Sequence, residues 1–169
     1  EPELSSELSI LEFYLGPWSV TERHYDRAGK VVATVKGTEE VTWILDKHAI
    51  RRAYNTANDD FIFRAIGTIS YGQVDGQYHG VWFDNVGTSG PMTSAGTWNN
   101  ETMTMTFTTS RIGPGGDAVV HRVVEHFVTS TLRQTTTYLV EGDQVIKLLE
   151  VQYKRAHPCP ARIQRIFDG

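Results

Sequence analysis

Polar and apolar residues alternate with a period of two over most of the chain, from about residue 17 to residue 155. The clearest stretch is 102–108, where threonine fills the even positions and methionine or phenylalanine fills the odd ones. This pattern is typical of a β-strand with one buried and one solvated face. Turn signals divide the alternating region into about ten predicted strands. The signals lie at 27–29, 46–47, 58–60, 74–76, 85–91, 99–100, 112–117 and 141–143.

The order of these strands is predicted to be antiparallel and mostly up and down. Asp75-Gly76 and Glu141-Gly142-Asp143 favour tight hairpins, because Gly and Asp accept the positive φ that such turns need. The chain has no internal repeat and no helix to cover a second sheet face. Closure into an all-β barrel is therefore favoured, since closure removes the exposed sheet edges. A two-sheet sandwich is the alternative.

Helical spacing is confined to the N-terminal residues. Leucines at 4, 8, 11 and 15, with Ser5 and Ser6 as capping residues, predict one short amphipathic helix over 3–14. We expect it to lie against the barrel or across one of its ends. The chain is thus interpreted as one domain over 1–169, with a barrel over 17–155 and a tail over 156–169 that docks on the barrel wall or on a neighbouring subunit.

Charge and composition remove several classes of function. The formal net charge of -4 comes from dispersed residues without a basic stripe, so no nucleic-acid partner is expected. No apolar run reaches the roughly 18 residues of a membrane span, which predicts a soluble protein without a membrane partner. Cys159 is the only cysteine, so no intrachain disulfide can form. The compartment stays open between the cytoplasm and a periplasmic or secreted location after signal removal, because the sequence starts at Glu1-Pro2.

Several short motifs along the chain point to a known family. They are Leu15-Gly16-Pro17-Trp18, Gly76-Gln77-Tyr78, Trp82-Phe83-Asp84, Ser94-Ala95-Gly96-Thr97 and Glu150-Val151-Gln152-Tyr153-Lys154-Arg155. The first resembles the Gly-x-Trp opening of the calycin superfamily, and together they resemble the bacterial lipocalin-like family DUF1579. The resemblance implies a lipocalin-like barrel whose base is closed by Trp18. It implies no reaction, because the family carries none that is established.

Aromatic residues on one strand parity predict an internal pocket. On a closed barrel of about ten strands, these side chains would point into an interior larger than they can fill, leaving space for an apolar or aromatic ligand. The alternative is that they are simply core. Asp84, at a strand end, could line the pocket mouth or form an Asx turn, and Arg155 could bind the ligand. The predicted aromatic contacts are Trp18, Trp43, Tyr71, Trp82, Trp98 and Tyr153.

Titratable residues on the same faces suggest a second function. Glu22 and His24 share a face with Trp18, and His121 shares one with Glu125. A histidine beside a carboxylate is a workable general acid/base set for a cofactor-free lyase, isomerase or cyclase. Such pairs are also common as surface ion pairs. The face of 119–128 is ambiguous, and the opposite parity would instead turn Arg122 and His126 inward.

No motif calls for a cofactor or a metal. The chain lacks a dinucleotide-binding Gly-x-Gly-x-x-Gly, a P-loop and a Gly-x-Ser-x-Gly. His157-Pro158-Cys159 offers at most two metal ligands in the tail, fewer than zinc normally takes. One further alternative to ligand binding and catalysis stays open, in which the barrel is filled and acts as an interaction module. Separately, Ile146 and Leu148 on the last strand would permit a homodimer.

Overall fold

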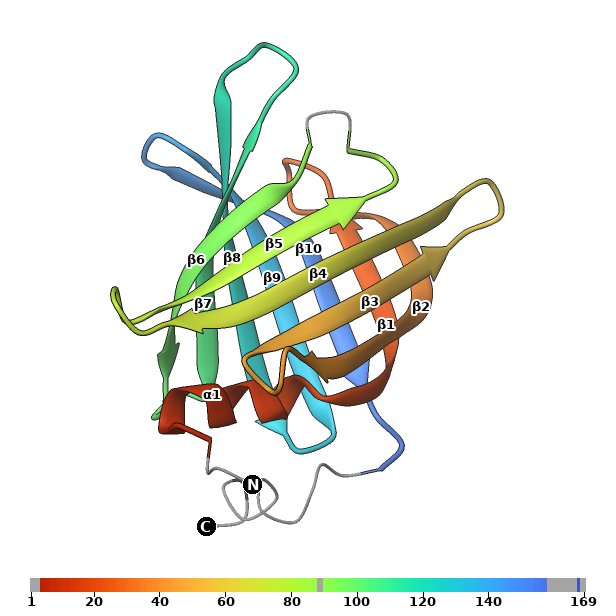
Figure 1. Ribbon diagram of the computed structural model, residues 1–169. Helices are drawn as coiled ribbons and strands as arrows, with labels where there is room; N and C mark the ends of the chain where they lie inside the picture. Colours follow the sequence, from red (N-terminus) through yellow and green to blue (C-terminus); the bar gives the residue numbers. More distant parts are fainter. Residues whose placement is uncertain (1–3, 88–89, 158–166, 168–169) are drawn as a thin grey trace.

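Ten antiparallel strands form a closed barrel in the computed structural model, which describes residues 4–87, 90–157 and 167 (Figure 1). Each strand pairs with its neighbour in the sequence, and β1 pairs with β10, so no sheet edge is left unpaired. The predicted barrel is confirmed, and the sandwich alternative is wrong. The strands are β1 (Gly16–Tyr25), β2 (Val31–Ile44), β3 (Ala49–Ala57), β4 (Ile62–Gly72), β5 (Gln77–Asp84), β6 (Met92–Asn99), β7 (Thr104–Ile112), β8 (Ala118–Thr129), β9 (Leu132–Glu141) and β10 (Gln144–Lys154).

The turns between the strands mostly fall where the sequence predicted them. Gly76 and Gly142 take positive φ values of 68° and 59° in the β4–β5 and β9–β10 turns. One turn was not predicted, at 130–131 between β8 and β9, because Ser130 and Thr131 carry no glycine, proline or Asx signal. In the threonine-rich stretch, Met105 is buried as expected, whereas Met103 lies in the preceding turn with a φ of 52°.

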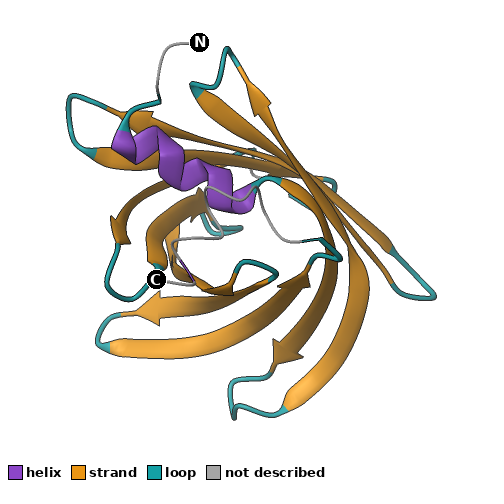
Figure 2. Ribbon diagram, turned by 90° about the horizontal axis from the view of Figure 1, so that it is seen from below, coloured by secondary structure: helices purple, strands orange, loops and turns teal. Residues whose placement is uncertain are grey.

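A short helix crosses one end of the barrel (Figure 2). It consists of α1 (Ser6–Ile10) and a 3-10 turn, η1 (Leu11–Tyr14), so it begins later than the predicted span of 3–14. The start is fixed by Ser5, whose hydroxyl accepts a hydrogen bond from the Leu8 amide at 3.2 Å. Gly16, with a φ of 105°, then turns the chain into β1. Within the described residues, no helix is long and apolar enough to cross a bilayer.

Aromatic side chains fill the barrel end beneath this helix. Phe13 is buried and stacks on Trp98 with ring centroids 5.6 Å apart, and Tyr14 meets Phe127 edge-on at 4.9 Å. The Trp18 indole donates a 2.7 Å hydrogen bond to the Tyr14 carbonyl, so Trp18 closes the base as the family resemblance implied. This end of the barrel is called the closed end below.

The predicted tail over 156–169 lies largely outside the described residues, and with it Cys159. Of its last residues only Phe167 is described, and its ring meets Phe13 edge-on at 5.6 Å. The loops β1–β2, β3–β4, β5–β6, β7–β8 and β9–β10 all lie at the opposite end of the barrel, which is called the mouth (Figure 1).

Candidate functional site

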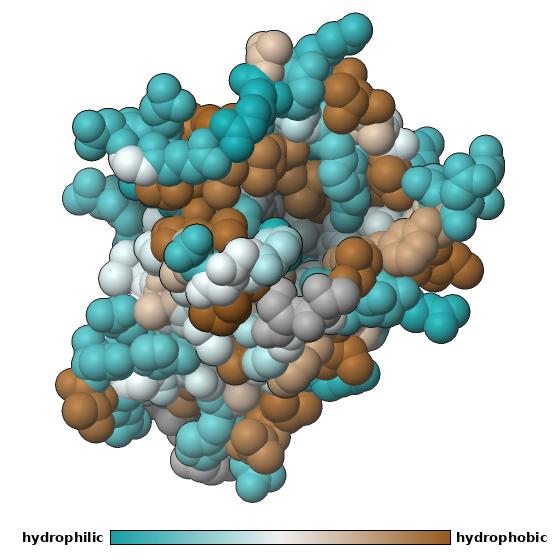
Figure 3. Space-filling model, turned by 90° about the horizontal axis from the view of Figure 1, so that it is seen from above, coloured by the Kyte–Doolittle hydropathy of each residue, from teal (hydrophilic) through white to brown (hydrophobic). Residues whose placement is uncertain are grey.

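A cavity of about 630 Å³ occupies the barrel interior on the mouth side. The view from above shows the molecule hollowed near its middle (Figure 3). This cavity overturns the alternative of a filled barrel. Most of its wall is apolar, built from Val35, Phe61, Phe63, Ile69, Val81, Trp82, Met92, Phe107, Val123, Leu149 and Val151.

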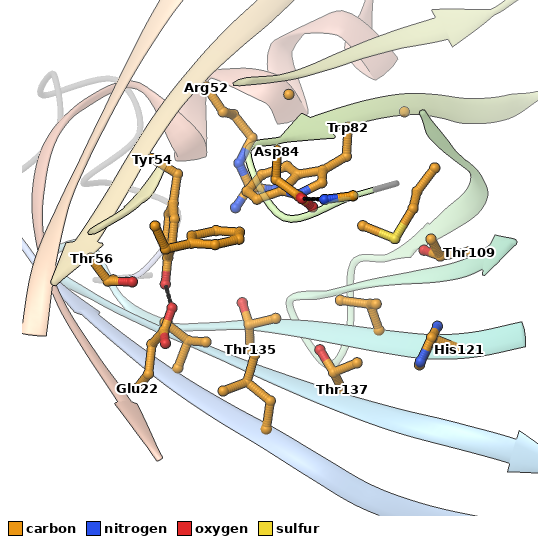
Figure 4. Close-up of a pocket in the computed structure, with 18 of the residues that line it drawn as sticks. Glu22, Arg52, Tyr54, Thr56, Trp82, Asp84, Thr109, His121, Thr135 and Thr137 are labelled. Carbon is orange, nitrogen blue, oxygen red and sulfur yellow. Dashed lines mark hydrogen bonds between the residues drawn. The ribbon is translucent and has the colours of Figure 1, made fainter. Parts of the chain in front are cut away.

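The space exists because many lining positions on this side carry small residues. Gly67, Gly80 and Ser94 line one side of the cavity, and Thr135 and Thr137 line the other. Figure 4 shows the two threonines across the cavity from Trp82. Glycine is needed at position 67, since an added Cβ would lie only 2.7 Å from the Trp82 ring. The absence of a side chain there leaves room for the indole.

Two arginines and two glutamates form a buried cluster between the cavity and the closed end. Arg52 donates to Glu39 from Nε at 2.7 Å and to Glu125 from Nη1 at 3.0 Å, and Arg133 donates from Nη2 to the other oxygen of Glu39. The four side chains come from β2, β3, β8 and β9. Arg52 and Glu125 reach the cavity surface, so the cluster, called the charged floor below, forms its bottom.

Aromatic rings complete the environment of the deepest arginine. The Arg133 guanidinium carbon lies 3.8 Å from the ring centroid of Tyr153, 4.9 Å from that of Trp18 and 5.0 Å from that of Tyr14. Nε and Nη1 of Arg133 are buried without a hydrogen-bond partner among the described residues. The cation–π contacts with these rings stabilise the guanidinium charge in place of such bonds. Burial alone would raise the pKa of Glu39, but Arg133 and Arg52 outweigh it and hold that pKa below its ordinary value.

Glu22, His24 and Tyr54 form a second polar group on the cavity wall. The Tyr54 hydroxyl donates to Glu22 Oε1, and His24 Nε2 lies 2.7 Å from Glu22 Oε2. Figure 4 shows Glu22 and Tyr54 pointing toward each other inside the cavity. The hydrogen bond to Glu22 raises the pKa of His24, and burial raises the pKa of Tyr54 far above its ordinary value. Tyr54 is therefore a hydrogen-bond donor, and Glu22 is its acceptor.

The ambiguity of β8 is resolved by the structure. His121 and Glu125 face the cavity, whereas Arg122 and His126 are exposed on the outer surface. The two inward residues do not form a pair, since Glu125 belongs to the charged floor and His121 lies nearer the mouth. Burial, together with the positive charge of Arg111, lowers the pKa of His121.

The predicted ligand-binding residues divide between the cavity and the closed end. Trp82, Asp84 and Tyr153 line the cavity. Asp84 is also held in a turn, because its Oδ1 accepts the amides of Val86 at 2.9 Å and Gly87 at 2.6 Å.

Five other predicted ligand-binding residues do not line this cavity: Trp18, Trp43, Tyr71, Trp98 and Arg155. Tyr71 lines a separate pocket that also includes Leu8 of α1. Trp98 stacks on Phe13, and Tyr71 packs on Tyr78 with centroids 5.0 Å apart. Trp43, near the end of β2, is partly buried and packs against the hydrophobic core of the barrel.

Arg155 links three backbone segments at the base of the barrel. Its guanidinium donates to the carbonyls of Ser130, Leu15 and Phe13 at 2.7, 2.5 and 3.2 Å and lies 4.1 Å from the Trp18 ring centroid. It therefore ties η1 and the following Leu15 to the β8–β9 turn.

Sequence reasoning missed Arg52 and Arg133. The signal was present, because Arg52 shares the inward parity of Ile50 and Tyr54, and Arg133 shares that of Thr135. Both arginines are nearly inaccessible, with 7% and 0% of their surface exposed, and each is paired with Glu39. Inward-facing arginines opposite an inward-facing glutamate would have identified the charged floor.

Among the described residues, no group of three or more His, Cys, Asp or Glu side chains is arranged to hold a metal ion. Of the two possible ligands noted in the tail, Cys159 lies outside the described residues.

Comparisons with known proteins give one family match and two structural matches. A family model described as "Protein of unknown function (DUF1579)" matches residues 3–155. The S-type phycobiliprotein lyase CPES from Guillardia theta has a similar fold, with a TM-score of 0.59 and 11% identity over 92% of this chain and 99% of that one. A redesigned β-barrel matches at a TM-score of 0.45 and 12% identity, over 92% of this chain and 100% of its own. No curated protein matches the sequence.

Proposed function

The chain belongs to the DUF1579 family, which is described as a family of proteins of unknown function. From its cavity, we propose that the barrel binds a small, largely apolar or aromatic molecule. The observation that carries this proposal is the cavity of about 630 Å³, with an apolar wall and a few convergent polar groups at its bottom. Ligand sites commonly have volumes of roughly 300–1,000 Å³ and this division between apolar and polar lining.

The orientation of the ligand follows from the lining. Trp82, Phe63 and Phe107 supply flat apolar contact area, and Arg52 and Glu22 are charged groups at or near the bottom. An amphiphilic molecule would bury its apolar body between the rings and place one polar group toward the charged floor. The barrel shared with a phycobiliprotein lyase supports a cavity-based role without identifying the ligand.

A second candidate function is acid/base catalysis in the same cavity, as in a lyase, isomerase or cyclase. The observation in its favour is the Glu22, His24 and Tyr54 group, in which one carboxylate links a histidine and a protonated tyrosine. His24 could take up or release a proton near neutral pH, while Tyr54 could stabilise a developing negative charge. A catalyst would need this group for turnover, but not for binding.

The test of binding is to block the cavity. Val123 lines the cavity, and Val124 is its neighbour on the other face of β8. With N-phenyl-1-naphthylamine as a fluorescent probe, we expect saturable binding to the wild type, its loss in Val123→Trp, and its retention in the matched Val124→Trp. Equal binding by the two variants would mean that the probe sits outside the cavity, and absence of binding to the wild type would refute the proposal.

The test of catalysis starts from the protein's own ligand. Native mass spectrometry before and after mild denaturation would identify any small molecule that the purified protein retains. Incubating that molecule with the wild type and with Glu22→Gln then separates the two candidate functions. Conversion by the wild type alone, with binding kept in the variant, is the result expected of an enzyme, while unchanged ligand in both is expected of a binding protein.

A further inference from the structure

We propose that the polar group which the ligand places at the charged floor is a hydrogen-bond donor, such as a hydroxyl, an N–H or an ammonium group, and not an anion. This inference rests on the proposed binding function and specifies its chemistry. Most acidic amphiphiles, including carboxylates bound head-first, would be excluded by it. The reasons are the charge balance of the floor and the hydrogen-bonding capacity that remains there.

No unpaired positive charge is available at the floor. Arg52, the arginine that reaches the cavity, is already bonded to Glu39 and Glu125. Arg133 is fully buried beneath it, bonded to Glu39 and enclosed by aromatic rings. A carboxylate placed here would meet Glu125 in the floor and Glu22 on the wall above it, and in a partly desolvated site that repulsion is strong.

Acceptor capacity, in contrast, is left over. Glu125 is 2% exposed, and its Oε2 lies within hydrogen-bond distance of no donor among the described residues, although the buried Tyr14 hydroxyl interacts with this carboxylate from the closed end. The hydroxyl of Thr135, its cross-strand neighbour on β9, is also buried without a partner there. Both side chains line the cavity, but the two unpaired oxygens themselves are almost inaccessible, so a ligand group reaches them only if the side chains rotate. Buried acceptors of this kind are costly unless a donor satisfies them.

Glu22 adds further acceptor sites above the floor. Each of its oxygens takes part in one hydrogen bond, with Tyr54 on one side and His24 on the other. A carboxylate has about four lone-pair positions, so Glu22 can accept from a ligand without releasing either partner. A donor group that enters between the rings therefore meets the Glu22 carboxylate and gains a charge-assisted hydrogen bond there.

The test uses a series of naphthalenes that differ in one substituent: 2-naphthol, 2-(aminomethyl)naphthalene, 2-methylnaphthalene and 2-naphthoate. Each displaces N-phenyl-1-naphthylamine, whose own affinity is measured first in every variant. The series is measured in the wild type and in Arg111→Gln, because Arg111 is a cation at the mouth and could hold a carboxylate in the reverse orientation. We expect the two donors to bind about tenfold more tightly than 2-methylnaphthalene, and 2-naphthoate to bind most weakly in Arg111→Gln.

A matched pair of variants locates the effect. Glu22→Gln removes an inward carboxylate that accepts from a tyrosine, and Glu150→Gln removes an outward one that accepts from Tyr25. We expect the preference for 2-naphthol over 2-methylnaphthalene to fall to about threefold or less in the first variant and to persist in the second. Glu150→Gln thus controls for the loss of a carboxylate–tyrosine contact.

The outcomes separate this inference from the function on which it rests. If N-phenyl-1-naphthylamine does not bind the wild type, the proposed function itself fails. If it binds, but the four naphthalenes bind equally or 2-naphthoate binds most tightly in Arg111→Gln, only the donor preference is overturned.

Discussion

The two ends of the barrel are built from the same ten strands but are filled differently. At the closed end, Phe127 and Met105 are almost completely buried, and the helix crosses this end of the barrel (Figure 2). On the mouth side, Gly80 and Thr137 occupy lining positions and leave a cavity. A barrel of about ten strands encloses more space than ordinary side chains fill. The chain therefore concentrates its large side chains at one end of the barrel and leaves a cavity at the other end.

The charged floor lies at the border between the two ends. Buried ion pairs are poor sources of stability, because desolvation offsets most of the attraction. Their position here is more informative than their energy. Glu39 is bonded to Arg52 and Arg133, so the cluster holds Arg52 and Glu125 in fixed places at the bottom of the cavity. We therefore expect the cluster to be sensitive to loss of a single member.

The largest expected effect on the free energy of unfolding comes from removing the most deeply buried arginine of the charged floor. Arg133→Met should destabilise the protein by about 3–5 kcal/mol, since it leaves Glu39 with one arginine instead of two in a buried site. Arg111→Met, at the mouth, should cost less than about 0.5 kcal/mol. Urea unfolding followed by tryptophan fluorescence measures both. Similar costs for the two variants would contradict a division between a structural end and a functional end.

The next effect compares two methionines. Met105 is fully buried at the closed end, whereas Met92 is partly exposed and lines the cavity. Met105→Ala should cost about 2–5 kcal/mol, because it opens a void in a packed core. Met92→Ala enlarges a space that already exists, and about 1 kcal/mol or less is expected. If Met92→Ala proved as costly in urea unfolding, the mouth side would have to be as tightly packed as the closed end.

Much of this architecture could be predicted from the sequence, because period-two alternation determines which face of a strand a residue occupies. It does not determine the height of a residue along the barrel axis. Trp82 and Trp98 were both expected in the pocket, yet Trp82 lines the cavity and Trp98 stacks on Phe13 at the closed end. Height depends on strand register, and register is set by pairing between strands.

The charged floor was missed for a related reason. Arg133 lies 94 positions from Glu39 in the sequence, and Arg52 lies on the strand next to that of Glu39. Only the closure of the barrel brings β2 and β9 into contact across the interior. The Glu22 and His24 pair, two residues apart on one strand, needed no such closure and could be proposed from alternation alone.

The smallest expected effect separates two histidines that line the same cavity. The hydrogen bond to Glu22 raises the pKa of His24, whereas burial and Arg111 lower that of His121. Protonated His24 stabilises the fold, so its contribution is complete below its unfolded pKa of about 6.5 and is lost as the pH rises through the raised folded value. His121 has the opposite sign, because stability is lost as the pH falls from about 6.5 through its lowered folded value.

This contrast predicts opposite behaviour of two conservative variants. His24→Gln should lower the melting temperature relative to the wild type mainly below pH 6.5, with the gap closing as the pH rises. His121→Gln should raise it relative to the wild type at acid pH and leave it unchanged at alkaline pH. Thermal unfolding between pH 5 and 8, with NMR titration of the two imidazoles, measures both effects. Because the side chain of His24 is 42% exposed, solvent screens its pair with Glu22, and the shifts should be small. Parallel pH profiles for the two variants would mean that the carboxylate and the arginine do not create distinct environments within the cavity.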